Sequence, residues 1–301
     1  MAELCIQGFF IVSGALVFGS LDRSKSLALY ADKRVRRLYP AYAVIILVPA
    51  IASLIMTGFG DLGAVLRYVG VNLVFLNFLS PDLPGLFQAN RFTEVNGALW
   101  TLKIEVMFYM ALPVIALVMS WAGRRWWLIL ALIYVAAEAW RLGLPRLLDS
   151  PFAPELSRQL PGQMAFFASG MAVWKLWDKA KATPAKFGFF GAVLLAVSFA
   201  HPLLEPLRAA GLAGLIAAIA FLPGPKLDAA RFGDISYGLY ITHFPILQAL
   251  LAAGAFASLG LGWGGALAAV LVVAASFLLW HLVEKPALRR DSHYRLVSED
   301  T

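Results

Sequence analysis

The sequence predicts an all-α fold, a polytopic transmembrane helical bundle of about nine spans with one short re-entrant or interfacial helix. Of its 301 residues, 60% are hydrophobic and only 14% are charged, whereas a soluble domain carries about 25% charged residues. Long apolar runs recur along the whole chain, and no Gly/Ser/Pro-rich linker separates them. We therefore expect one membrane domain over residues 1–286, followed by a short cytoplasmic tail, 287–301.

The apolar runs give the expected elements in order. We place spans near residues 4–21, 41–57, 96–121, 126–142, 160–177, 186–200, 207–222, 235–255 and 263–283. The run 68–79 is too short to cross a bilayer, so we expect it to be re-entrant or interfacial. Residues 80–93 are rich in Pro, Gly and Asn, which indicates a loop. The first apolar run lacks a preceding basic segment, so no cleavable signal is expected.

Lysine and arginine gather in alternate loops, at residues 21–40, 121–126, 175–186, 223–234 and 284–301. The exceptions are Arg67, Arg91, Lys103, Arg141, Arg146, Arg158 and Arg208. Cytoplasmic loops carry the excess of basic residues, so these five loops and the C-terminus are predicted to be cytoplasmic. Nine spans then place the N-terminus outside.

Composition also limits the function classes. The formal net charge of +7 is largely explained by these orientation signals, and we expect no nucleic-acid partner. Cys5 is the only cysteine, which excludes an internal disulfide or a cysteine metal cluster. The sequence has no P-loop, no dinucleotide-binding glycine pattern and no zinc-site spacing, so no metal is predicted.

The stretch Asn96–Pro113, NGALWTLKIEVMFYMALP, places charged residues in a helix that is otherwise apolar enough to span a membrane. A charge at the centre of a span costs about 2.5–3.5 kcal/mol, so it usually faces protein or a wet cavity. Glu105 shares a helix face with Tyr109, four residues on. Lys103 lies about 200° round the helix from Glu105, so these two do not pair within the helix. The alternative is an interfacial helix start with both charges near water.

Two further sites suggest chemistry. In ADKRVRRLYP, Arg34 and Arg37 fall on one face if the segment is helical, and guanidinium groups suit phosphates. Positive-inside signalling and lipid headgroup contact explain them equally well. His243 lies at membrane depth, where it would shuttle a proton or accept an acyl group, or make a purely structural hydrogen bond between helices.

For other polar residues, the sequence context favours a structural role. Glu284 and Lys285, followed by Pro286, suggest a helix-end charge pair and a stop signal. Glu138 is expected to pair with Arg141, three residues on. Ser13 lacks the G-x-S-x-G context of a nucleophile elbow.

Five segments in order resemble the acyltransferase-3 family of integral-membrane O-acyltransferases, which modify bacterial surface carbohydrates. They are GFFIVSGALV, RVRRLYPAY, NGALWTLKIEVMFYMALP, FGDISYGLYITHFPIL and HLVEKPALR. They resemble the family segments FF-x-x-SG-F-L, R-x-x-R-I-Y-P, N-x-x-W-S-L-x-x-E-x-x-F-Y, G-x-I-S-Y-x-L-Y-x-x-H-x-P and x-x-E-K-P. Together they cover nearly the whole chain.

The resemblance implies an enzyme of about ten helices in the bacterial inner membrane. It would move an acyl group, usually acetyl from cytoplasmic acetyl-CoA, to a carbohydrate hydroxyl on the far side. By this resemblance, Arg34 and Arg37 would hold the CoA phosphates. Trp100, Glu105 and Tyr109 would lie near the acyl-transfer cavity, and His243 would line it or support the fold. We predict Glu105 and His243 as the catalytic residues, and the residues predicted to line the cavity are Ser13, Trp100, Lys103 and Tyr109.

The chain also departs from the family pattern. The family's first helix carries an arginine and, about ten residues later, a histidine thought essential, and Met1 falls after that helix. Two interpretations follow: a late start in a chain that is otherwise an ordinary acyltransferase, or a true truncation with impaired chemistry. Lys103 replaces a residue that is usually small and polar.

Two other functional classes remain open from the sequence. A cavity lined by Lys103, Glu105 and His243 would equally suit a glycan or lipid translocator, or an inactive partner subunit. A proton-coupled carrier would depend on titration of Glu105 or His243.

Overall fold

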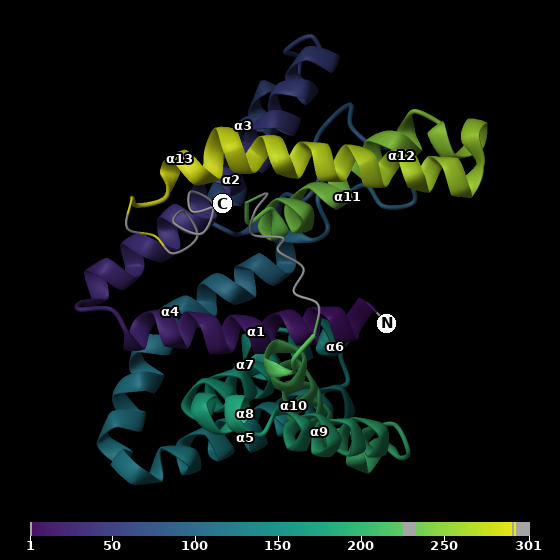
Figure 1. The fold of residues 1–301 in the computed structure, drawn as a ribbon. Coiled ribbons are helices and arrows are strands. Elements are labelled where there is room, and N and C mark those ends of the chain that lie inside the picture. The colour runs from purple at the N-terminus through teal and green to yellow at the C-terminus, as the bar shows by residue number, and fades with distance from the viewer. Residues whose placement is uncertain (1, 225–232, 291, 293–301) are drawn as a thin grey trace. The chain divides into compact units, whose positions relative to one another are not determined.

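The computed structural model describes residues 2–224, 233–290 and 292 (Figure 1), and it is helical, with no strand among them. This confirms the predicted all-α class over that part of the chain. The chain divides into two compact units, residues 1–30 with 104–225 and residues 31–103 with 226–301. Much of the predicted loop 223–234 and most of the predicted tail 287–301 lie outside the described residues.

The first unit holds the N-terminal helix and the middle of the chain. It also contains the larger part of α4 (Leu99–Ala122), from Ile104 onward. Its other elements are α1 (Ala2–Asp22), η2 (Gly123–Arg125), α5 (Trp126–Leu147), α6 (Ala153–Ser157), α7 (Leu160–Lys175), α8 (Trp177–Ala182), α9 (Pro184–Ser198), η3 (Pro202–Leu204) and α10 (Leu207–Phe221).

Helix α7 forms the core of this unit, and it packs against α1, α5 and α10. Two glycines let α1 and α7 meet backbone to backbone. A Cβ on Gly14 would lie 2.3 Å from the Phe167 carbonyl oxygen, and one on Gly170 would lie 2.0 Å from the Ile11 carbonyl oxygen. Phe108 of α4 stacks on Phe167 with ring centroids 3.9 Å apart. Small residues at such crossings are typical of membrane helix packing.

The second unit holds most of α2 (Leu27–Met56), the start of α4 and the C-terminal helices. In it α11 (Ser236–Ala252) packs against α12 (Ala255–Leu279), and α12 changes direction at Gly260, which has φ 75°. The other elements are α3 (Leu62–Leu73), η1 (Asn77–Leu79), the π-helical turn η5 (Trp280–Glu284) and α13 (Lys285–Ala287).

The basic segment 22–40 differs from its expected form. It was expected to end at Pro40, where the next span would begin, but α2 runs unbroken from Leu27 to Met56 with Pro40 and Pro49 inside it. Arg34 and Arg37 therefore belong to the same helix as the predicted span 41–57. Proline removes one backbone donor, and membrane helices tolerate this where neighbouring groups satisfy the freed carbonyl.

Four stretches of the described chain are long and apolar enough to cross a membrane: Glu3–Asp22, Leu27–Met56, Leu99–Leu147 and Ala255–Ala287. The third contains two helices, because α4 and α5 meet at η2, where Gly123 has φ 54°. Helices α3, α9 and α10 have 12, 15 and 15 residues, fewer than the roughly 20 of a full span. The total of nine spans stays a prediction, as does the re-entrant placement of 68–79.

Candidate functional site

A buried carboxylate with two hydroxyl donors lies in the first unit. Glu105 on α4 is 7% exposed, and its Oε1 accepts hydrogen bonds from Ser13 Oγ at 3.1 Å and from Tyr109 Oη at 2.5 Å. Ser13 comes from α1, and Tyr109 lies one turn along α4. The structure thus brings together three of the predicted site residues.

Local sequence explains how these side chains are held. The i, i+4 spacing puts Tyr109 directly over Glu105 on α4. Gly14, which follows Ser13 in α1, allows α1 to approach α7 closely, and this fixes α1 beside the core. Tyr30 Oη donates to the Tyr109 carbonyl oxygen at 3.2 Å. The hydroxyl groups and the carboxylate are therefore placed by packing rather than by a flexible loop.

A carboxylate in an apolar bundle can take a proton from a hydroxyl, and hydroxyl neighbours can orient it or donate to a developing oxyanion. A carboxylate oxygen accepts hydrogen bonds and donates none when ionised. The two donors on Oε1 match that requirement. This cluster therefore has the composition expected of an acid–base site.

In the second unit, Arg37 is held between two acids. Its Nη2 lies 2.6 Å from Asp234 Oδ2, and its Nη1 lies 2.5 Å from Glu284 Oε2. The Glu284 side chain is only 1% exposed. The expectation that Glu284 forms a helix-end pair with its neighbour Lys285 was wrong: a buried carboxylate needs a close, hydrogen-bonded cation, and Arg37 is that partner.

The geometry around this ion pair is closely fitted. Glu284 ends the π-helical turn η5, which begins at the fully buried Trp280. Gly233 has φ 93°, and a Cβ there would lie 2.1 Å from Trp280 Nε1. The guanidinium of Arg37 also lies 5.6 Å from the centroid of the Trp280 ring. The segment just before α11 and the end of the last long helix are thus both fastened to α2.

Both predicted phosphate ligands lie on α2. Both terminal nitrogens of Arg37 contact carboxylates, so binding a phosphate there would require displacing or sharing them. Arg34 lies almost one turn earlier on α2 and is half-buried. Of the two predicted phosphate ligands, Arg37 is thus part of an ion-pair network with Asp234 and Glu284.

His243 on α11 has its Nδ1 2.6 Å from the carbonyl oxygen of Tyr240. A carbonyl only accepts, so Nδ1 carries the proton and Nε2 is the basic nitrogen of the neutral ring. Tyr240 Oη lies within hydrogen-bond distance of the Thr101 hydroxyl, and Asn96 Nδ2 donates to the Ile241 carbonyl at 2.9 Å. The start of α4 is thereby bound to α11.

The remaining predicted cavity residues also lie in the second unit. Trp100 is half-buried in the first turn of α4. The Lys103 ammonium lies 5.0 Å from the centroid of the Phe78 ring, a distance at which a cation is attracted to an aromatic face. The structure therefore places Arg34, Arg37, Trp100, Lys103 and His243 in one unit, and Ser13, Glu105 and Tyr109 in the other.

Comparison with known proteins gives the family. The sequence model of the family described as an acyltransferase domain matches residues 1–283. The chain belongs to this family. It is 30% identical to Nodulation protein 10 of Rhizobium leguminosarum bv. viciae, over 93% of this chain and 81% of that protein. It is 28% identical to an O-acetyl transferase of Shigella phage Sf6, over 94% of this chain and 84% of that protein. No solved structure matches it.

This acyltransferase is a transferase enzyme, and its helices fit a multi-pass membrane protein. Sequence reasoning missed the roles of Asp234 and Glu284, although both lie within the family-like segments FGDISYGLYITHFPIL and HLVEKPALR. The one sequence signal for them was an acidic residue beside an apolar run. Their partner on α2 is far away in sequence, so the pairing becomes visible only in the tertiary structure.

The predicted pair of Glu138 and Arg141 is confirmed at 2.7 Å. It is part of a larger network in the first unit of the acyltransferase. Glu205 accepts from Arg141 at 2.7 Å and lies 3.1 Å from Arg208. These four charges compensate each other, which supports a structural role.

Proposed function

We propose that this acyltransferase moves an acetyl group from cytoplasmic acetyl-CoA to a hydroxyl of a cell-surface or exported carbohydrate, in the bacterial inner membrane. Glu105 takes the proton of the acceptor hydroxyl as that oxygen attacks the thioester carbonyl. The thioester C–S bond then breaks, the CoA thiolate takes the proton from Glu105 and leaves as the thiol, and the acetyl group is joined to the carbohydrate oxygen as an ester.

The observation that carries this proposal is the Glu105 carboxylate, buried in an apolar bundle and hydrogen-bonded by Ser13 and Tyr109. A base in such surroundings suits abstraction of a hydroxyl proton. Two relatives support the class, since one is named as an O-acetyl transferase and both align over most of this chain. The cationic start of α2 supports an anionic donor.

The test follows acetyl transfer in inverted membrane vesicles supplied with radiolabelled acetyl-CoA, and it measures base-labile label in the carbohydrate fraction. Glu105→Gln keeps the size of the side chain and removes its basicity, so we expect a fall of about 100-fold or more in transfer. Glu155→Gln, an exposed carboxylate on α6, is the matched control and should transfer as the wild type does. Wild-type transfer by Glu105→Gln would falsify the assignment of Glu105 as the base.

The donor side has its own experiment. Arg34→Gln should weaken acetyl-CoA binding by about tenfold or more, since a charged hydrogen bond is worth about 1.5–3 kcal/mol. Arg36→Gln is the control, because Arg36 is exposed and pairs with Asp32 at 2.7 Å. If the two variants bind acetyl-CoA equally well, Arg34 is not a donor ligand. If wild-type vesicles move carbohydrate across the membrane without consuming acetyl-CoA, the chain is a translocator instead.

A further inference from the structure

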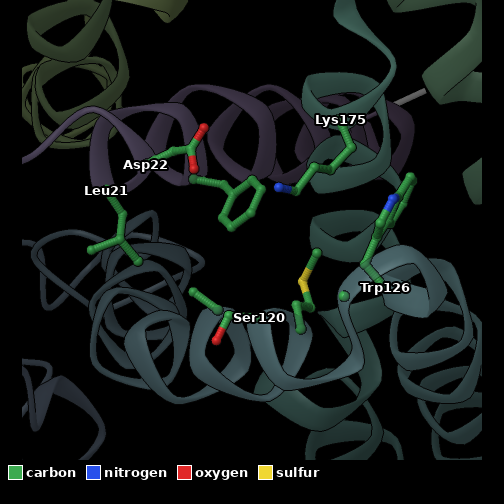
Figure 2. A pocket seen from close by; sticks show the side chains of 9 residues that line it. Leu21, Asp22, Ser120, Trp126 and Lys175 are labelled. Carbon is green, nitrogen blue, oxygen red and sulfur yellow. The ribbon is translucent and has the colours of Figure 1, made fainter.

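A small cleft opens in the first unit where α1, α4, α5 and α7 end or begin, and its volume is about 210 Å³. Figure 2 shows its walls: Leu21 and Trp126 stand on opposite sides of the view, and Lys175 reaches inward from α7. None of its lining residues belongs to the Glu105 cluster or to the predicted donor site.

Three helices begin or end at the cleft, which is the arrangement expected near a membrane surface. Asp22 is the last residue of α1 and Lys175 is the last residue of α7, while Trp126 is the first residue of α5. The α1 helix is one of the membrane-length stretches. Ends of spanning helices meet the headgroup region, and tryptophan is enriched there. The cleft also joins residues from three loops that the sequence places on one side, the predicted cytoplasmic side.

The lining of the cleft carries one basic and one acidic side chain, Lys175 and Asp22, and Arg124 and Arg125 lie next to the lining residues Gly123 and Trp126 in the chain. Among the ion pairs of the described residues, none involves Lys175, Arg124 or Arg125. The Lys175 ammonium lies 5.4 Å from the centroid of the Phe18 ring, and both arginines are exposed in η2, between α4 and α5. Asp22 is the one acid of the lining, and its Oδ2 accepts from Trp174 Nε1 at 3.2 Å.

Apolar side chains make up much of the lining, and we refer to Phe18, Ala116 and Met119 as the floor of the cleft. A binding site for a whole small molecule usually has a volume of about 300–1,000 Å³. A smaller cleft with a cationic rim, an apolar floor and a position at the membrane surface suits one end of an amphiphile. CoA is too large and too polar for it.

We propose that this cleft binds the headgroup of an anionic phospholipid from the surrounding leaflet. Lys175 pairs with the lipid phosphate, with Arg124 and Arg125 adding to the local positive potential, and the apolar floor accepts the first carbons of the acyl chains. A basic residue near an anionic membrane surface contributes about 1 kcal/mol of attraction. Bound in this way, the lipid would bridge α1, α4, α5 and α7 at one end of the bundle.

The test is native mass spectrometry of the detergent-solubilised full chain with equal amounts of phosphatidylglycerol and phosphatidylethanolamine. We expect the wild type to retain phosphatidylglycerol preferentially, and Lys175→Gln to lower its apparent affinity by about fivefold. Lys181→Gln, an exposed lysine of α8 outside the cleft, is the control and should bind as the wild type does. Equal losses in the two variants, or equal retention of the two lipids by the wild type, would overturn the proposal.

A second variant tests the floor rather than the charge. Ala116→Phe fills the cleft from α4, and we expect it to reduce phosphatidylglycerol binding while Lys175 keeps its charge. Glycerol 3-phosphate is added as a competitor to separate a lipid from a soluble phosphate. Displacement of the lipid by equimolar glycerol 3-phosphate, or unchanged lipid binding by Ala116→Phe, would contradict a lipid site.

Discussion

Arg37 and Glu284 are 247 positions apart in the chain, yet their side chains form an ion pair at 2.5 Å in the second unit. Glu284 is almost fully buried, and Asp234 contacts the same guanidinium. Removing one partner of such a pair leaves a buried charge without compensation. Loss of activity on changing Arg37 would therefore not by itself identify a phosphate ligand.

We expect Arg37→Gln to destabilise the protein by about 3–5 kcal/mol, because it leaves Glu284 buried without its cation. The double variant Arg37→Gln/Glu284→Gln removes both charges and should recover most of the lost thermal stability. Thermal unfolding of purified protein, followed by size-exclusion fluorescence, measures this recovery. A double variant no more stable than Arg37→Gln would contradict the compensation.

The same pair of variants separates the two roles of Arg37. If Arg37 only fastens α2 to Glu284 and Asp234, the double variant regains acetyl-CoA binding together with its stability. If Arg37 also holds a phosphate, as the family resemblance implies, stability returns while acetyl-CoA binding stays at least tenfold weaker. We expect the second result, since Arg37 and Arg34 lie three residues apart on α2.

The hydroxyl groups around Glu105 should matter less than the carboxylate. Tyr109→Phe and Ser13→Ala each remove one donor to Oε1, and we expect transfer to fall by about tenfold or more in each, since one hydrogen bond to a charged group is worth about 1.5–3 kcal/mol. Ser169→Ala is the matched control, because Ser169 is also buried but donates to Ala165 of its own helix. The measurement is the initial rate of transfer from acetyl-CoA, and equal rates in Ser13→Ala and Ser169→Ala would speak against a role for Ser13.

The roles of the two ring nitrogens of His243 can be tested separately. Asparagine places an amide donor near the position of Nδ1 and so can keep the hydrogen bond to the Tyr240 carbonyl, whereas it offers nothing at Nε2. We expect His243→Asn to melt like the wild type and to lose most of its transfer activity, because a group acting through Nε2 is gone. Normal transfer by His243→Asn would leave His243 with only a structural role.

Gln248 fixes the loop 80–98 to α11. Its Nε2 donates to the carbonyl oxygens of Phe92 and Glu94 at 2.7 and 2.8 Å, and its Oε1 accepts from Asn90 at 2.9 Å. We expect Gln248→Leu to cost about 1–3 kcal/mol for the polar groups left unpaired and to speed amide exchange in residues 88–96. Hydrogen–deuterium exchange measures this effect.

The control for that experiment is Gln159→Leu, in the first unit, where the side chain donates to Glu155 at the protein surface. It should leave exchange in the loop unchanged. Unaltered exchange in Gln248→Leu would mean that the loop is held by other contacts.

Some of the site was readable from local sequence. The spacing of Glu105 and Tyr109 follows from the helical period, and so does the pairing of Glu138 with Arg141, because residues three and four apart share a helix face. The environment of Arg37 was not readable in this way. Its partners come from segments about 200 and 250 positions away, and no helical period relates residues at such separations.

The apolar composition by itself predicted a helical chain with membrane spans, because a chain with so few charges cannot cover itself with a polar surface. The order of its motifs determined its family. Tertiary structure alone decided that Ser13 meets Glu105, that Glu284 meets Arg37 and that Lys175 borders a cleft. The physical reason is that these contacts depend on which helix faces approach closely, and glycines such as Gly14 and Gly170 reveal that only once the packing is known.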